Sequence, residues 1–176
     1  AYLSFCILLM ACANTSDTKD TISFAQVDPF LKVFRESNFF PEYNETEEVA
    51  AGEHATFQFV VRSAATLKDL AIEVSPFTNE QRVTLPAVRS GFVDFVRVGR
   101  QTPDRAKDAI TSLSHYYPDP IIEKDRWNVE RDMTQPIWLT ANIPSDAAPG
   151  DYKATFRLTG KAGGKLFRQE KEIRIK

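Results

Sequence analysis

The chain has 176 residues and a formal net charge of −2, with Lys and Arg dispersed among Asp and Glu. This length is enough for one domain with its own hydrophobic core, and without a basic block we expect no nucleic-acid partner. Thirteen Phe and ten Pro favour many short strands over long helices.

The chain opens with an apolar stretch over residues 1–11 that is too short to span a bilayer. Such a stretch is typical of the hydrophobic part of a secretory signal. No Met and no positively charged segment precede it, so we expect it to be the later part of a longer signal. Leu9-Met10-Ala11-Cys12 resembles a bacterial lipobox, which implies cleavage before Cys12 and lipidation of its thiol.

A polar tether over residues 12–21 would follow the lipidated Cys12. We therefore expect a location in the bacterial cell envelope, periplasmic or at the cell surface, with membrane contact through the lipid anchor only. The alternative is a buried N-terminal strand with inert cysteines. Both cysteines lie in the first twelve residues, so no disulfide framework can hold the rest of the chain.

Residues 22–176 are expected to form a single domain of short strands separated by Pro and Gly. The clearest strand of its first half is 53–62, where Ala55, Phe57, Phe59 and Val61 face one way and polar residues the other. Shorter apolar or alternating runs predict further strands at 30–34, 47–51, 70–74 and 83–85.

The middle of the chain is less regular. Residues 87–98 predict a longer strand whose apolar residues change face, either because Gly91 marks a bulge or because both faces are covered. Residues 99–124 predict a long loop, with a short helix over 105–113 and a rigid aromatic stretch, Tyr116-Tyr117-Pro118-Asp119-Pro120. A short strand is expected at 127–130.

The most regular pattern lies between residues 135 and 158. Two alternating strands, 135–143 and 151–158, flank a turn in which Pro149-Gly150 fits the centre of a type II turn. The sequence predicts a hairpin here, closed on its first strand by Pro144, which cannot donate to a ladder. A last strand at 166–175 is expected to pair with 152–158 through a Gly-containing turn.

Together these patterns predict an all-β fold with roughly eight to ten strands and at most one short helix. Sheets that are apolar on one face need a second sheet to cover them, so we expect an antiparallel β-sandwich of the immunoglobulin-like or jelly-roll-like kind.

Residues suited to catalysis are few. The two histidines, His54 and His115, are far apart in the sequence and have no thiolate nearby, so we expect no metal site and no cofactor. There is no Gly-rich phosphate loop and no serine in a nucleophile elbow. The sequence does not exclude a pair of Asp or Glu side chains placed as in a glycosidase. A charge on the polar face of a strand is, however, usually just solvated.

The remaining candidate is an aromatic set that could contact a glycan or a neighbouring domain. Aromatic faces stack on sugar rings, and a nearby carboxylate accepts hydrogen bonds from hydroxyl groups. The alternative is that these residues cover an open end of the sandwich. Trp138 is expected to be covered by another part of the chain. The candidate residues are Tyr116, Tyr117, Asp119 and Trp127.

An ordered set of motifs resembles the N-terminal β-sandwich domain of glycoside hydrolase family 123 and related bacterial lipoproteins. The resemblance covers residues 28–175. It lies in Asp28-Pro29-Phe30-Leu31-Lys32-Val33-Phe34, Gly52-Glu53, Phe57-Gln58-Phe59-Val60-Val61-Arg62, Tyr117-Pro118-Asp119-Pro120, Gln135-Pro136-Ile137-Trp138-Leu139-Thr140, Ile143-Pro144, Asp146-Ala147, Pro149-Gly150 and Tyr152.

This resemblance implies a non-catalytic accessory domain that packs against a catalytic (β/α)8 domain in the same polypeptide. Enzymes of the family hydrolyse N-acetylgalactosaminides with help from the substrate's acetamido group, and their catalytic Asp-Glu pair belongs to the barrel. We therefore expect no catalytic residue in this chain, although the parent protein would be a glycoside hydrolase. The alternatives are a stand-alone surface module that binds glycans and an envelope sandwich that binds proteins through an exposed edge strand.

Overall fold

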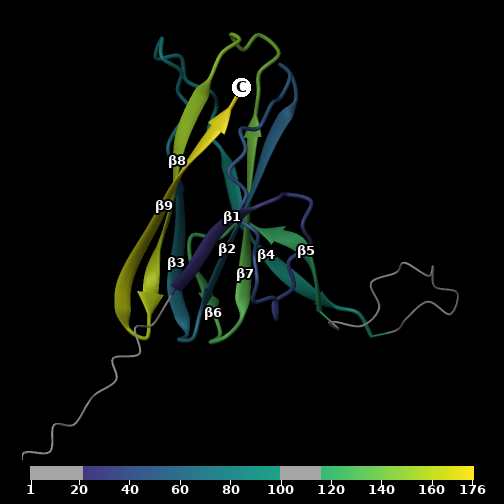
Figure 1. The fold of residues 1–176 in the computed structure, drawn as a ribbon, viewed down its shortest axis with the longest axis vertical. Helices are drawn as coiled ribbons and strands as arrows, with labels where there is room; N and C mark the ends of the chain where they lie inside the picture. The colour runs from purple at the N-terminus through teal and green to yellow at the C-terminus, as the bar shows by residue number, and fades with distance from the viewer. Residues whose placement is uncertain (1–21, 100–115) are drawn as a thin grey trace, which may run out of the picture.

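The computed structural model describes residues 22–99 and 116–176, which form two facing antiparallel β-sheets (Figure 1). Nine strands and no helix are found in this part of the chain, which confirms the predicted β-sandwich. The five-stranded sheet has the order β1 (Ile22–Val27), β2 (His54–Ser63), β7 (Thr134–Asn142), β4 (Arg89–Arg97) and β5 (Tyr116–Ile122). The four-stranded sheet has the order β6 (Trp127–Val129), β3 (Leu67–Val74), β8 (Tyr152–Ala162) and β9 (Lys165–Ile175).

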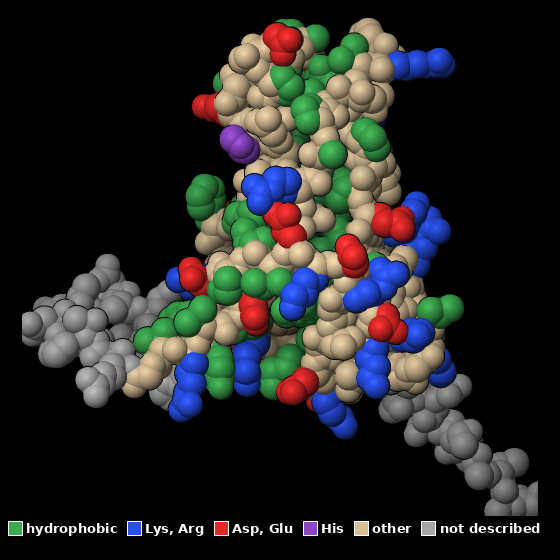
Figure 2. Space-filling view, turned by 180° about the vertical axis from the view of Figure 1, so that it is seen from behind, with side chains coloured by type: hydrophobic (Ala, Val, Ile, Leu, Met, Phe, Trp, Pro, Cys, Tyr) green, Lys and Arg blue, Asp and Glu red, His purple; other side chains and the backbone are tan. Residues whose placement is uncertain are grey.

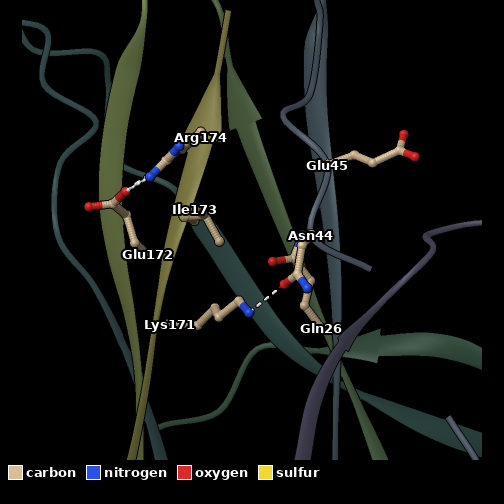
Figure 3. A pocket seen from close by; sticks show the side chains of 7 residues that line it. All are labelled: Gln26, Asn44, Glu45, Lys171, Glu172, Ile173 and Arg174. Carbon is tan, nitrogen blue, oxygen red and sulfur yellow. Dashed lines mark hydrogen bonds and ion pairs between the residues drawn. The ribbon is translucent and has the colours of Figure 1, made fainter. Parts of the chain in front are cut away.

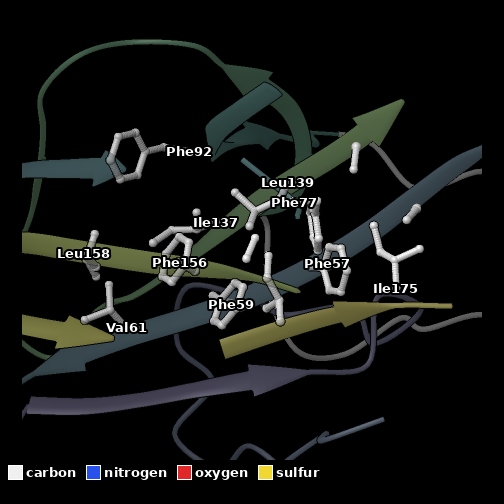
Figure 4. Close-up of a cluster of buried hydrophobic side chains, with 14 of the residues drawn as sticks. Phe57, Phe59, Val61, Phe77, Phe92, Ile137, Leu139, Phe156, Leu158 and Ile175 are labelled. Carbon is white, nitrogen blue, oxygen red and sulfur yellow. The ribbon is translucent and has the colours of Figure 1, made fainter. Parts of the chain in front are cut away.

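The core lies between the sheets and consists of the apolar side chains that alternate along each strand (Figure 4). Phe59 of β2 stacks on Phe156 of β8 with ring centroids 4.0 Å apart, and both are fully buried. Full burial of one such side chain stabilises the fold by roughly 1.5–3 kcal/mol. The other side chains without exposed surface include Phe57, Phe77, Phe92, Ile137, Leu139 and Leu158.

The predicted hairpin between 135–143 and 151–158 is wrong in one respect. Both strands exist, and Gly150 adopts a positive φ of 143°, but β7 pairs with β2 and β4 while β8 pairs with β3 and β9. The turn therefore carries the chain from one sheet to the other. Both strands have an apolar face, and these faces meet across the core.

The hairpin between β8 and β9 is confirmed, with a register that runs unbroken from Tyr152–Ile175 to Ala162–Lys165. Its turn contains Gly163 and Gly164, both with positive φ. Two such residues in succession suit a two-residue turn that matches the twist of the strands.

Three of the short predicted strands are not strands. Residues 30–34 form a turn and irregular chain, residues 47–51 contribute one parallel bridge from Glu47 to Ile175, and residues 83–85 contribute one bridge from Thr84 to Thr78. Short apolar runs do not specify a strand unless a partner edge is free to pair. The sequence analysis also predicted no strand at β1.

The predicted loop at residues 116–120 is also wrong, because these residues belong to β5. This strand lies at the edge of its sheet, where Pro118 and Pro120 can be accommodated. In the neighbouring β4, the irregularity falls between Val93 and Phe95 and not at Gly91. Phe92 and Val93 are both buried, so this strand is covered on both faces. The helix expected over 105–113 lies outside the described residues.

Candidate functional site

Trp127 lies on β6 at the edge of the four-stranded sheet and closes the space between the two sheets. One ring face stacks on Phe92 of β4, with centroids 5.5 Å apart, and Lys124 Nζ lies 5.4 Å from the ring centroid. The indole Nε1 donates a hydrogen bond to Gln135 Oε1 at 2.7 Å. The side chain is thus engaged by the protein itself through a ring face and its polar atom.

Gln135 explains why a proline can follow it in the central strand β7. The ladder between β4 and β7 runs from Arg89–Thr140 to Phe92–Ile137, and the next step would bring Val93 to Pro136, which has no N–H. Gln135 Nε2 donates to the Val93 carbonyl at 2.8 Å in its place. The buried amide therefore stabilises both the end of this ladder and the position of Trp127.

Tyr116 and Tyr117 begin β5 and contact the segment that crosses the outer face of the five-stranded sheet. We call residues 28–45 the covering segment. The Arg35 guanidinium lies 4.1 Å from the centroid of the Tyr116 ring, and Phe34 meets Tyr117 edge to face at 5.6 Å. Neither tyrosine lies with Trp127, which belongs to the other sheet. The predicted role of these aromatic residues in glycan contact stays a prediction.

The covering segment is held in place by side chains of the sheet beneath it. The buried amide of Gln58 donates from Nε2 to the carbonyls of Asp28 and Leu31, both at 2.9 Å. Asp28 Oδ1 in turn accepts the backbone N–H of Phe30 at 2.8 Å. This turn therefore has a defined shape, and it presents the Phe30 side chain with 96% of its surface exposed.

Trp138, which was expected to be covered by another part of the chain, is half-buried beneath the covering segment. It pairs with Gln58 of β2 on one side and with Gly91 of β4 on the other, and it points to the outer face because its neighbours Ile137 and Leu139 are in the core. Its position among the polar residues of an alternating strand was the available signal.

A shallow pocket of about 260 Å³ lies over Trp138. We call it the Trp138 pocket. It contains Asp119 from the predicted set, although Tyr116, Tyr117 and Trp127 do not line it. Its lining residues from the covering segment include Phe30, Leu31 and Lys32, and those from the sheet include Pro118, Asp119, Ile121 and Trp138.

A second, mostly apolar pocket of about 330 Å³ lies at the end of the sandwich where the described chain reaches Lys176. We call it the end pocket. Its wall includes the turn between β7 and β8, in which the Tyr152 hydroxyl donates to the Ala148 carbonyl at 2.8 Å. Lys176 is held beside it, because its N–H donates to Glu47 and its carbonyl accepts from Val49. Apolar lining residues include Val49, Leu85, Ile143, Ala147, Ala148 and Ile175.

A polar groove of about 300 Å³ runs between β1 and β9 (Figure 3). Three of its four charged lining residues interact within the protein: Lys171 Nζ donates to Asn44 and to Glu42, and Arg174 pairs with Glu172. Since these groups already have partners, the groove offers little for a ligand.

An acidic side chain, Glu47, belongs to the same region as this groove. Among the described residues its Oε1 atom is buried without a hydrogen-bond partner. Burial raises the pKa of Glu47, against the effect of a hydrogen bond from Tyr43, and the negative charges of Asp28 and Glu45 raise it further. Burial and the same acidic neighbourhood raise the pKa of Tyr43 to about 12.

Charge is distributed unevenly over the molecule. Seen from behind, Lys, Arg, Asp and Glu crowd the lower half, and fewer of them are visible at the upper end (Figure 2). On the four-stranded sheet, Arg157 pairs with Glu73 and Glu170, each at 2.6 Å, and Lys161 pairs with Asp69 at 2.9 Å. Exposed pairs of this kind stabilise a fold only slightly, but they mark a solvated face.

No group of three or more His, Cys, Asp or Glu residues in 22–99 and 116–176 is arranged to hold a metal ion. Within the same residues there is no helix long and apolar enough to cross a membrane. The predicted lipidation site, Cys12, lies outside the described residues.

Comparison with known proteins gives one family. A family model described as the glycoside hydrolase 123 N-terminal domain matches residues 35–160. A family 123 glycoside hydrolase from Clostridium perfringens, studied for glycolipid glycan hydrolysis, has a similar fold, with a TM-score of 0.66 at 15% identity over 88% of this chain. The match covers 27% of that protein's chain, so the present chain spans about a quarter of its relative.

Other similarities are weaker. PapD-like domain 7 of human CEP192 has a TM-score of 0.39 at 11% identity, covering 99% of this chain and 94% of that one. The CooA pilin subunit of enterotoxigenic Escherichia coli has a TM-score of 0.38 at 12% identity, covering 74% and 88%. These scores are too low to support an argument. No curated protein sequence matches the chain.

Proposed function

The chain belongs to the family of glycoside hydrolase 123 N-terminal domains, and from this membership we propose that it is the non-catalytic accessory domain of a lipid-anchored glycoside hydrolase. The observation that carries the proposal is the family match over residues 35–160. The fold shared with the C. perfringens enzyme over 88% of this chain agrees with it. The catalytic (β/α)8 domain would belong to the same polypeptide.

The coding sequence downstream of Lys176 tests this proposal directly. We expect it to continue with alternating strands and helices, the pattern of a (β/α)8 barrel. A stop codon immediately after Lys176 would contradict the proposal, because the accessory domain would then have no catalytic partner in its own chain.

The substrate class follows from the family resemblance. We propose that the parent protein hydrolyses N-acetylgalactosaminides, including glycans carried on lipids, as the C. perfringens relative is described to act on glycolipid glycans. Release of N-acetylgalactosamine by the parent protein, measured against the 176-residue chain alone, is the test. We expect activity from the parent protein only, and hydrolysis by the chain alone would show that the catalytic groups lie here.

The end pocket is suited to contact with the catalytic domain. In an N-terminal domain the following polypeptide begins beyond the last strand, and Lys176 is fixed beside this pocket by two backbone hydrogen bonds to the segment around Glu47. A mostly apolar hollow, here with Asp151 and Lys176 among its lining residues, is the kind of surface that packs against another domain.

An added charge in the end pocket tests this contact in the parent protein. Ala148 is exposed there, and the hydrogen bond from Tyr152 uses its backbone carbonyl, so Ala148→Glu should leave the sandwich folded. We expect the two domains to separate, seen as faster limited proteolysis between them and a larger radius of gyration in solution scattering. The matched control is Ala64→Glu, an exposed alanine at the opposite end. Equal behaviour of both variants would reject the end pocket as the contact.

The anchor is proposed to be a lipid on Cys12, in line with the lipobox-like Leu9-Met10-Ala11-Cys12. Mass spectrometry of the membrane fraction should find an N-terminal peptide that begins with modified Cys12. We expect Cys12→Ser to move the parent protein out of the membrane fraction. An unmodified Cys12 peptide from that fraction would contradict the anchor and the envelope location that depends on it.

A further inference from the structure

The Trp138 pocket holds polar groups that the protein itself does not use. Among the described residues, the indole N–H of Trp138 has no acceptor, and the side chains of Asp119 and Lys32 form neither a hydrogen bond nor an ion pair. The pocket thus combines the aromatic floor and N–H donor of Trp138 with an acceptor, Asp119, and a second donor, Lys32.

The shape of the pocket is fixed by the fold. Gly91 lies next to Trp138 on β4, and a Cβ atom there would come within 2.6 Å of Ile121 Cγ2. The absence of that atom allows Ile121 of the edge strand to lie over β4 beside Trp138. On the other side, the turn held by Gln58 places Phe30 at the rim. Such a site needs little rearrangement to bind a ligand, which favours affinity.

From these groups we propose that the Trp138 pocket binds one neutral pyranose ring. The aromatic face of Trp138 would stack on the C–H groups of the sugar. Asp119 would accept and Lys32 would donate hydrogen bonds to hydroxyl groups. One acid and one base at the rim favour a neutral sugar over a charged one.

The size of the pocket suits a small ligand. At about 260 Å³ it is smaller than the sites of roughly 300 Å³ and above that hold drug-sized molecules, so the hollow itself has room for about one sugar ring. This inference goes beyond the accessory role and does not depend on it, because it requires only the chain described here.

The two tryptophans of the chain allow a direct test by NMR. Each gives one indole N–H signal, and Trp138→Phe identifies which belongs to Trp138. On titration with N-acetylgalactosamine or methyl galactoside, we expect the Trp138 signal to shift saturably and the Trp127 signal, whose N–H is bound to Gln135, to shift much less. Asp119→Ala should weaken the apparent affinity about tenfold, as expected for a hydrogen bond to a charged group.

The matched control is Phe39→Ala, which removes an aromatic residue that is 80% exposed on the covering segment but does not line the pocket. The Trp138 signal of this variant should shift with added sugar as it does in the unsubstituted 176-residue chain. A Trp138 signal that does not move, or that drifts linearly and is unaffected by Asp119→Ala, would overturn the proposal. A shift that appears only when the separate catalytic domain is added would instead show a protein-docking surface.

Discussion

The side-chain amide of Gln135 is the centre of a small hydrogen-bond network at the edge of the apolar core. It accepts from Trp127 Nε1 and donates to the carbonyls of Val93 and Pro136. A buried amide whose hydrogen bonds are all made lowers the stability of the fold very little. Its removal is costly, because several buried polar groups are then left without a partner or water.

We expect Gln135→Leu to lower the free energy of unfolding by about 2–4 kcal/mol, because the Trp127 N–H and the Val93 carbonyl would each lose a partner. Urea unfolding followed by tryptophan fluorescence measures the change. Trp127→Phe keeps the stacking on Phe92 but lacks the N–H, so it should lower the free energy of unfolding by less than Gln135→Leu does. The double variant should lose less unfolding free energy than the two single variants lose together. If the two losses simply add, the two side chains do not act together.

Glu47 predicts a pH dependence of stability. Its pKa is raised in the folded protein, so the native state binds its proton more tightly than the unfolded chain does. The free energy of unfolding should therefore fall as the pH rises from about 4, the ordinary range of a glutamate, through the raised pKa.

Glu47→Gln should remove this contribution and give a protein that is more stable than the parent chain at neutral pH. Urea unfolding of both proteins from about pH 4 to pH 7 measures the difference. The matched control is the neighbouring, exposed Glu48, and Glu48→Gln should leave the profile unchanged. Parallel profiles for the parent chain and Glu47→Gln would show that the Glu47 carboxyl titrates alike in both states.

At the scale of elements, β5 depends on a close approach to β4. The missing Cβ atom of Gly91 leaves room for Ile121, and the Ile122 carbonyl oxygen would lie only 3.1 Å from an added Cβ atom. The edge strand therefore cannot keep its position if residue 91 gains a side chain.

We expect Gly91→Ala to destabilise the fold by about 1–3 kcal/mol, in the range of overpacked sites, and to speed hydrogen exchange in β5. Ile121→Ala in the same chain should restore part of the loss, because it removes the nearest atom, while the contact with the Ile122 carbonyl remains. Gly99→Ala serves as the control, since a Cβ atom there meets nothing within 4 Å. Full stability of Gly91→Ala would contradict the close packing.

The strands with strict alternation could be predicted from the sequence, and their pairing could not. Burial alternates strictly along β8, whereas β2 and β7 alternate in sequence although part of their outer face is buried too. Alternation indicates which face of a strand is buried, but it does not indicate which strand lies next to it. The turn between β7 and β8, which joins the two sheets, was therefore predicted to be a hairpin turn. The stretch Tyr116–Ile122 was mistaken for a loop because its prolines argue against a strand unless the strand lies at an edge.

The candidate site was predictable only in part, for a related reason. Asp119 was identified from its aromatic surroundings, but its neighbours in space, Trp138 and Phe30, come from β7 and the covering segment. Trp127 was grouped with Asp119 by nearness in the sequence, although the sandwich places it in the other sheet. Contacts between distant segments are set by topology, which the residue pattern alone does not specify.

At the scale of the whole molecule, the two functional proposals use different regions. The end pocket lies beside Lys176, while the Trp138 pocket lies on the outer face of the five-stranded sheet, between the covering segment and β5. An accessory domain with this arrangement could hold a catalytic domain at its end and a sugar on its side. Because the lining residues do not overlap, Ala148→Glu should leave the Trp138 titration unchanged.

The described chain enters and leaves the sandwich at opposite ends. Ile22 of β1 pairs with Ser63, at the end of β2 opposite to His54, whereas Ile175 of β9 lies at the end where Tyr152 begins β8 (Figure 1). Tension between a membrane anchor and a following domain would therefore run along the strands. It would load the ladders in shear, so that many hydrogen bonds must break together. Pulled from both termini, the domain should act as a stiff mechanical spacer, with a high rupture force in single-molecule stretching.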